Sequence, residues 1–142
     1  MLFGSRNKSS KAYVLPKIVL LGTVYSGSGD GKKFVCLPWV KIQIEQKLGF
    51  SPYPGTLNLH LNKENKKKKR LLEPPIGIMI EPQIGYCPGI LLKACVRSLD
   101  CAVVTPKVPN YPSDVIEIIS PVYLREHLNL ADGSLVTISV NV

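Results

Sequence analysis

The amino-acid sequence predicts a mainly β protein that folds as one small barrel or sandwich. Eight short segments are rich in Val, Ile and Leu and are bounded by Gly, Pro, Asn or Asp, as strands are. The chain has 142 residues, 45% of them apolar and 20% charged, which suits a single domain with its own core. Many short strands in so small a domain are typical of a closed or sandwiched sheet.

The strands follow a polar, basic segment, residues 1–16, that has little apolar surface to bury and is predicted to be a flexible arm. The single folded domain is then residues 17–142. In order, the predicted strands are KIVLLGTVYSG (17–27), KFVCLP (33–38), TLNLHLN (56–62), IGIMIEP (76–82), ILLKACV (90–96), CAVVTPK (101–107), DVIEIIS (114–120) and LVTISVNV (135–142).

Two segments favour short helices. In WVKIQIEQKLGF (39–50), apolar residues recur every four positions and Gly49 is a suitable C-terminal stop, although Ile42 also permits a strand. In SPVYLREHLNL (120–130), Ser120 can cap the helix, Pro121 fits its first position, and Leu124 and Leu128 share a face. The sequence ADG (131–133) then turns the chain into the last strand.

The net charge of +8 is concentrated in a few places. The run NKKKKR (65–70) carries five positive charges, and we interpret it as part of a solvated, mobile loop spanning residues 62–74. A nucleic-acid-binding patch is the alternative interpretation.

The four cysteines have neither a C-x-x-C pair nor the spacing of a zinc site, so they are predicted to be small apolar core residues with free thiols. The chain shows no signal peptide and no apolar run approaching 18 residues. We therefore expect a cytoplasmic protein without membrane contact.

Alternation in TLNLHLN suggests a metal site. Its leucines face one side of the strand, and Thr56, Asn58 and His60 face the other. Side chains two apart on a strand are about 7 Å apart at the backbone, so the oxygens of Thr56 and Asn58 could share one ion. Such ligands suit Mg²⁺, and the preceding turn PYPGT would hold Thr56 in place. An ordinary half-solvated strand is the alternative.

The stretch GSGDGKK has glycines at every second position, Gly27, Gly29 and Gly31, followed by Lys32 and Lys33. Backbone N–H groups of such a stretch can converge on a phosphate, and the lysines would add positive charge. A hairpin turn explains the glycines equally well. The pattern matches neither the Walker phosphate loop nor the dinucleotide fingerprint.

Two charged residues near the C-terminus complete the candidates. Glu117 shares a strand face with Val115 and Ile119, where its carboxylate needs a partner unless the strand lies at an exposed edge. Arg125 lies near the start of the second predicted helix, where anions are favoured; alone, it reads as a surface arginine.

Three motifs in this order, SGSGDGKKF followed by LP, LGFSPYPGTLN, and VIEIISPVYLREHLNLADG, closely resemble the archaeal CTP-dependent riboflavin kinases. The resemblance runs from about residue 17 to the C-terminus. It implies a small six-stranded cradle-loop β-barrel with one or two short helices. It also implies transfer of the terminal phosphate of CTP to the 5′-hydroxyl of riboflavin, giving FMN and CDP.

The resemblance also assigns residues. Thr56 and Asn58 correspond to Mg²⁺ ligands, and Glu117 to a carboxylate that contacts the flavin and is a candidate catalytic group. The residues that correspond to nucleotide contacts are Gly27, Ser28, Gly29, Asp30, Gly31, Lys32, Lys33, Val122, Tyr123, Leu124 and Arg125. The implied partners are riboflavin and CTP, with a monomeric protein and no nucleic acid.

One position departs from the family pattern. Pro109 stands where the family commonly has a threonine that touches the flavin, and proline has neither a hydroxyl nor a backbone N–H. The neighbouring Asn110 could substitute. A flavin-binding protein without kinase activity is therefore one alternative. A nucleic-acid-binding barrel that uses the basic run NKKKKR is a second. The use of another triphosphate is a third, because no side chain can be assigned to the cytosine base from the sequence.

Overall fold

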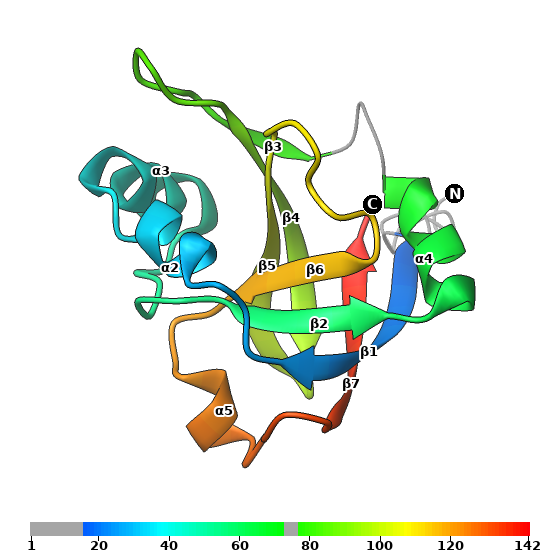
Figure 1. The fold of residues 1–142 in the computed structure, drawn as a ribbon. Helices are drawn as coiled ribbons and strands as arrows, with labels where there is room; N and C mark the ends of the chain where they lie inside the picture. The colour runs from blue at the N-terminus through cyan, green and yellow to red at the C-terminus, as the bar shows by residue number, and fades with distance from the viewer. Residues whose placement is uncertain (1–15, 73–76) are drawn as a thin grey trace, which may run out of the picture.

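Seven β-strands form one sheet in the computed structural model, which describes residues 16–72 and 77–142. They are β1 (Lys17–Tyr25), β2 (Leu57–Leu61), β3 (Ile78–Ile80), β4 (Gly89–Val96), β5 (Leu99–Pro106), β6 (Val115–Ile119) and β7 (Leu135–Asn141). The strand order is β3-β4-β5-β6-β2-β1-β7, and β4 also pairs with β7. All strands but β3 therefore close into a six-stranded antiparallel barrel, to which β3 adds at β4 (Figure 1). The predicted barrel is confirmed.

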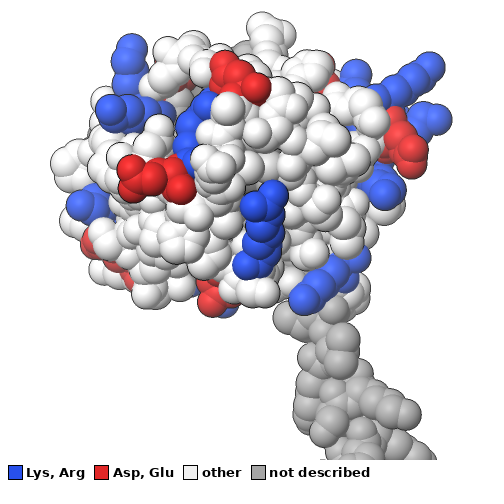
Figure 2. All heavy atoms as spheres, turned by 90° about the horizontal axis from the view of Figure 1, so that it is seen from below, with Lys and Arg blue, Asp and Glu red and all other residues white. Residues whose placement is uncertain are grey.

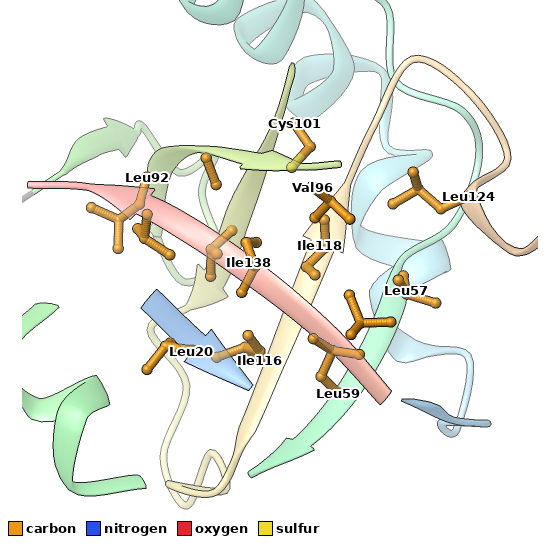
Figure 3. Close-up of a cluster of buried hydrophobic side chains, with 14 of the residues drawn as sticks. Leu20, Leu57, Leu59, Leu92, Val96, Cys101, Ile116, Ile118, Leu124 and Ile138 are labelled. Atoms are coloured by element: carbon orange, nitrogen blue, oxygen red, sulfur yellow. The ribbon is translucent and has the colours of Figure 1, made fainter. Parts of the chain in front are cut away.

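Alternating side chains fill the barrel. On β2 the three leucines are buried while Asn58 and His60 face outward, as predicted. Figure 3 shows Leu59 of β2, Ile116 and Ile118 of β6, and Ile138 of β7 pointing into a common interior. Because inward-facing and outward-facing residues alternate along each strand, the polar residues between these inner side chains project from the outer wall of the barrel.

Short helices lie around the barrel (Figure 1). The helices of the described residues are α2 (Asp30–Val35), α3 (Pro38–Leu48), α4 (Lys63–Lys69), the 3₁₀ helix η1 (Arg70–Leu72) and α5 (Leu124–His127). The described residues thus contain more helices than the one or two predicted. Helix α3 confirms the predicted helix, and it ends at Gly49, whose φ of 80° is left-handed.

A second core covers the outside of β5 and β6. Val40 and Ile44 of α3 pack there with Ala102 and Val104 of β5, all of them 0–1% exposed. This packing explains an incorrect prediction, since residues 33–38 are not a strand but the end of α2 and the start of α3. Val35 is buried in this second core from a helix, and a short apolar run does not distinguish the two structures.

The lysine-rich segment was wrongly predicted to be a loop. Residues 63–72 form α4 and η1, while residues 73 and 74 lie outside the described part. Asn62 caps α4 by accepting a hydrogen bond from the Asn65 backbone N–H at 2.9 Å. The buried Asn65 side chain accepts one from the Leu21 N–H, also at 2.9 Å, and so anchors α4 to β1.

The last helix starts later than predicted. Helix α5 begins at Leu124 with Tyr123 as its N-cap, so Ser120 and Pro121 precede it. The Ser120 hydroxyl instead accepts a hydrogen bond from the Val122 N–H at 3.2 Å, which closes a local turn before the helix. Leu124 is buried in the barrel core and Leu128 packs against that core, as predicted.

The predicted arm, residues 1–16, lies outside the described residues except for its last position. The division into an arm and a domain stays a prediction. Among residues 16–72 and 77–142 a helix able to cross a bilayer is absent, and the longest helix, α3, has 11 residues.

The four free cysteines differ in burial, which partly contradicts the prediction that all are core residues. Cys36 and Cys87 are exposed, Cys95 is half-buried, and Cys101 is buried in the barrel. Burial raises the pKa of the Cys101 thiol to about 12.

Alkylation should therefore proceed in a defined order. With iodoacetamide at about pH 8, Cys36 and Cys87 should react first, because only roughly one Cys101 in 10,000 is then a thiolate. Peptide mass spectrometry would identify the modified residues, and the same reaction in urea should label all four. Labelling of native Cys101 as fast as Cys36 would contradict the buried placement.

Candidate active site

Thr56, Asn58 and Glu117 form one polar cluster on the outer wall of the barrel. Asn58 of β2 lies directly opposite Glu117 of β6 in the sheet register, and Thr56 immediately precedes β2. The Thr56 Oγ1 lies 2.9 Å from Asn58 Oδ1 and 3.1 Å from Glu117 Oε1. Since Thr56 has one hydroxyl proton, it donates to only one of these acceptors at a time. The cluster therefore places two oxygen acceptors beside a single donor.

Glu117 is buried, with 8% of the residue exposed, in a strand that lies between β5 and β2. The alternative of an exposed edge strand is therefore wrong. The carboxylate has partners on both sides, because the Tyr111 hydroxyl donates a hydrogen bond to Oε2 at 2.5 Å and Thr56 contacts Oε1. Burial, and then the hydrogen bond to Glu117, raise the pKa of Tyr111 above its ordinary value.

Replacing Tyr111 by Phe should lower the free energy of unfolding by about 1–3 kcal/mol at neutral pH, since a buried carboxylate loses a hydrogen bond. The raised pKa keeps folded Tyr111 protonated where the unfolded chain ionises. Its contribution is thus complete below about pH 10 and declines as the pH rises further. Urea unfolding at about pH 8 and pH 10.5 should show that the free energies of unfolding of Tyr111→Phe and the wild type lie closer together at the higher pH.

Tyr86, which is 52% exposed, supplies the matched control as Tyr86→Phe. The control should stay within about 0.5 kcal/mol of the wild type. An equal loss of unfolding free energy in both variants would contradict a stabilising role for the hydrogen bond from Tyr111 to Glu117.

The glycine segment, residues 27–31, closes over this cluster. A Cβ at Gly31 would collide with the Glu117 carboxylate and the Thr56 hydroxyl, and a Cβ at Gly27 would collide with the Asn58 amide. Gly29 has a φ of 90° and turns the chain into α2, so the hairpin alternative is wrong. Side chains are excluded from positions 27 and 31 because the polar cluster itself comes so close to the backbone.

A cavity of about 500 Å³ lies on one side of the cluster. The glycine segment, Asn58, Glu117 and the loop before β6 form its walls, and both Pro109 and Asn110 line it. The other lining residues are Tyr25, Phe34, Pro106, Val108, Tyr111, Pro112 and Val115. The structure thus brings the predicted flavin residues together with the segment 27–31.

A second cavity, of about 50 Å³, lies between the segment 53–57 and the chain that enters α5. Thr56 and the four predicted residues of segment 122–125 line it. At its mouth the rings of Tyr53 and Tyr123 stack at 4.9 Å with an interplanar angle of 15°. Thr56 therefore belongs to the small cavity and Asn58 to the large one, and the polar cluster lies between the two.

The predicted charged residues take different positions. Lys32 and Lys33 are exposed on α2 and belong to the lining of neither cavity. Arg125 lines the small cavity, and its Nη2 lies 2.7 Å from Asp132 Oδ1. Hydrogen bonds from Arg125, and then from Ser26, lower the pKa of Asp132.

Tyr111, Asp132 and Ser26 were not among the site residues predicted from the sequence. Tyr111 lies in the segment KVPNYPSD, which was already expected to reach the flavin, so its hydroxyl was a detectable signal. Asp132 was taken as a turn residue in ADG, and Ser26 as the end of a strand. Nothing local to either residue indicates that they meet Arg125.

The polar cluster fits a magnesium ion. Thr56 Oγ1 and Asn58 Oδ1 are close enough to share a cation, and Glu117 adds a carboxylate oxygen beside Thr56. Hard oxygen donors are the ligands that Mg²⁺ takes. Among the described residues, no group of three or more His, Cys, Asp or Glu side chains forms a rival metal site.

Comparison with known proteins gives consistent matches. A family model named CTP-dep_RFKase, with the description "Domain of unknown function DUF120", matches residues 24–140. The riboflavin kinase of Archaeoglobus fulgidus is 39% identical over 127 residues, which cover 87% of this chain and 54% of that protein. The riboflavin kinase of Pyrobaculum aerophilum is 39% identical over 133 residues, covering 89% and 62%. That of Saccharolobus solfataricus is 39% identical over 134 residues, covering 90% and 77%.

The chain spans 54% of the length of the Archaeoglobus protein and 62% of that of the Pyrobaculum protein. The matched region contains the polar cluster, the glycine segment and both cavities.

Proposed function

The chain belongs to the archaeal CTP-dependent riboflavin kinase family, and on this premise we propose that it transfers the γ-phosphate of CTP to the 5′-hydroxyl of riboflavin. The products are FMN and CDP. The observation that carries the proposal is the position of Thr56, Asn58 and Glu117 between two cavities of unequal size. Phosphoryl transfer requires two substrates to meet at one point, and a cluster of oxygen ligands between two cavities suits that need.

Riboflavin occupies the larger cavity in this proposal. The walls contain apolar surface from Phe34, Val108 and Pro109, which suits the flat ring system, and polar groups from Asn110 and Glu117. The Glu117 carboxylate accepts a hydrogen bond from the ribityl chain and directs its terminal hydroxyl toward the cluster. Because Pro109 lacks the family's hydroxyl, Asn110, with a φ of 61°, takes over the polar contact at this loop.

CTP extends across the polar cluster in this proposal. Segment 122–125, at the small cavity, holds one part of the nucleotide, and the phosphates reach the backbone of residues 27–31, which form one wall of the large cavity beside riboflavin. Lys32 and Lys33 add positive charge at the exposed edge, where an exposed side chain can follow a polyanion. Arg125 supplies guanidinium donors from the small cavity.

Thr56 and Asn58 hold the Mg²⁺ in this proposal. When bound, the ion neutralises charge on the phosphate oxygens and orients the γ-phosphate. Glu117 accepts a hydrogen bond from the Thr56 hydroxyl, which leaves the Thr56 oxygen lone pairs directed away from the carboxylate. The 5′-oxygen of riboflavin attacks the γ-phosphorus, and the bond from that phosphorus to the β,γ-bridging oxygen breaks, so that CDP leaves. The hydroxyl proton is released to water after the new phosphorus–oxygen bond has formed. A loose transition state needs little early deprotonation, so no histidine has to act as base.

We further place the reaction in the cytoplasm and assign it to a monomer. Four free cysteines suit a reducing compartment. Residues of one chain line both cavities. On the face that Figure 2 shows, Lys and Arg side chains lie among neutral and acidic ones.

Incubation of the purified chain with riboflavin, CTP and Mg²⁺, followed by chromatography, tests this function. We expect FMN and CDP in equal amounts, and EDTA should abolish both. Parallel reactions with ATP, GTP and UTP measure the preference for cytosine. Riboflavin binding without turnover would support the alternative of an inactive flavin-binding protein. Salt-sensitive binding to nucleic acid without turnover would support the alternative of a nucleic-acid-binding barrel.

A further inference from the structure

A carboxylate joins the two segments that are assigned to the nucleotide. Asp132, in the turn between α5 and β7, lies 2.7 Å from Arg125 Nη2 through Oδ1. The Ser26 hydroxyl lies 3.0 Å from each Asp132 carboxylate oxygen and 3.4 Å from Arg125 Nη2. Ser26 directly precedes the glycine segment, and 106 positions separate it from Asp132. Ser26 thus meets two side chains, Arg125 and Asp132, that lie about 100 positions further along the chain.

The backbone holds the Asp132 turn rigidly. The Gly133 N–H donates to the Val24 carbonyl and the Val24 N–H donates to the Ser134 carbonyl, both at 2.8 Å. Within the turn, the Ser134 N–H donates to the Ala131 carbonyl and the Ala131 N–H donates to the Ser134 hydroxyl oxygen, both at 3.0 Å. Asp132 therefore lies on a turn that is fixed to the end of β1, immediately before Ser26.

The pair of Arg125 and Asp132 is too exposed to be explained as a stabilising device. The Asp132 side chain is 58% exposed and that of Arg125 is 26% exposed. Ion pairs at such positions contribute little to the stability of a fold. Geometry is the better explanation, because the Asp132 carboxylate determines where both Arg125 and Ser26 lie.

We propose that Asp132 is a positioning residue for the donor nucleotide, holding Arg125 and the start of the glycine segment so that both reach the same triphosphate. This inference rests on the proposed function, since its ligand is the donor of that reaction. Arg125 contacts Asp132 and Ser26 through Nη2, and a guanidinium has further donors on Nε and Nη1 that can bind a phosphate. Asp132 orients Arg125 from one edge and leaves the other edge to the nucleotide.

Steady-state kinetics of Asp132→Asn, Asp132→Ala and Ser26→Ala test the proposal. For the Asp132 variants we expect the KM for CTP to rise about 10- to 100-fold, as for a misplaced binding group, with the KM for riboflavin changed less than about twofold. Ser26→Ala should change the same constants in the same direction by a smaller factor. Because the pair adds little stability, thermal unfolding should stay close to that of the wild type.

Glu81→Gln is the matched control, because it removes the same charge at an exposed position whose observed hydrogen bonds are made by the backbone. It should leave both KM values unchanged. Equal CTP constants in Asp132→Asn and Glu81→Gln would overturn the proposal.

Two further measurements separate this inference from the proposed function. Calorimetric titration with CDP should show weaker binding to Asp132→Asn than to Glu81→Gln even if riboflavin is not phosphorylated. Hydrogen exchange of the backbone amides of residues 27–33 should be faster in Asp132→Ala than in the wild type without any ligand. Unchanged exchange together with unchanged CDP affinity would overturn the role of Asp132, whereas a wild type that binds CDP but forms no FMN would overturn only the function.

Discussion

The double variant Thr56→Val/Asn58→Ala is expected to form FMN at least about 1,000-fold more slowly than the wild type, because both side-chain oxygens proposed to hold Mg²⁺ are removed. The fold should persist, since both residues project from the outer wall while the three leucines of β2 keep the barrel filled. Initial rates of FMN formation give the loss. Mn²⁺ binding followed by electron paramagnetic resonance gives a measurement that does not depend on turnover.

Strand β7 offers a matched control. Thr137 and Ser139 are also two positions apart and lie on the outer face of the barrel. The variant Thr137→Val/Ser139→Ala removes two hydroxyl oxygens in the same arrangement and should keep Mn²⁺ binding and activity within about threefold of the wild type. Full activity of the Thr56/Asn58 variant would exclude these residues from the metal site.

Gly31→Ala is expected to reduce FMN formation by about 100-fold or more, because one methyl group would enter the polar cluster. A Cβ at this position would come 2.5 Å from Thr56 Oγ1 and would also collide with the Glu117 carboxylate. Either α2 moves away from β2 or Glu117 leaves Thr56, and both changes disrupt the meeting point of the two cavities. We expect a lower kcat together with a higher KM for riboflavin.

Gly85→Ala is the control for Gly31→Ala. It separates the effect of a methyl group entering the polar cluster from the general effect of replacing a glycine by alanine. Gly85 has a φ of 87°, and a Cβ there would have no atom within 4 Å. The control should lose about 1 kcal/mol of stability from left-handed backbone strain and retain activity. Equal activities of Gly31→Ala and Gly85→Ala would show that the close approach at Gly31 has no functional importance.

Much of the fold was predictable because it depends on local patterns. The alternation of TLNLHLN placed its leucines inside the barrel and Thr56 and Asn58 on one outer face. The four-residue spacing and Gly49 predicted α3 with its end. Residues 33–38 misled the prediction because a short apolar run can be buried by a helix as well as by a strand. The lysine run misled it too, because its helix depends on the Asn62 cap and the bond from Leu21 to Asn65.

The candidate site was predicted in part. The interpretation of Glu117 as a carboxylate in need of a partner was sound, and the structure supplies that partner in Tyr111. The contact between the glycine segment and the polar cluster was not predictable, because the residues involved are far apart in the sequence. The same holds for the contact between Asp132 and Ser26, which are 106 positions apart.

Patterns among neighbouring residues were enough to predict seven of the eight proposed strands, the outward direction of Thr56 and Asn58, and the family. The tertiary structure alone decided that β2 pairs with β6, that Gly31 closes on Glu117, and that Asp132 meets Ser26. The physical reason is that closing a barrel brings together residues separated by tens of positions. No local preference encodes which of those residues will meet.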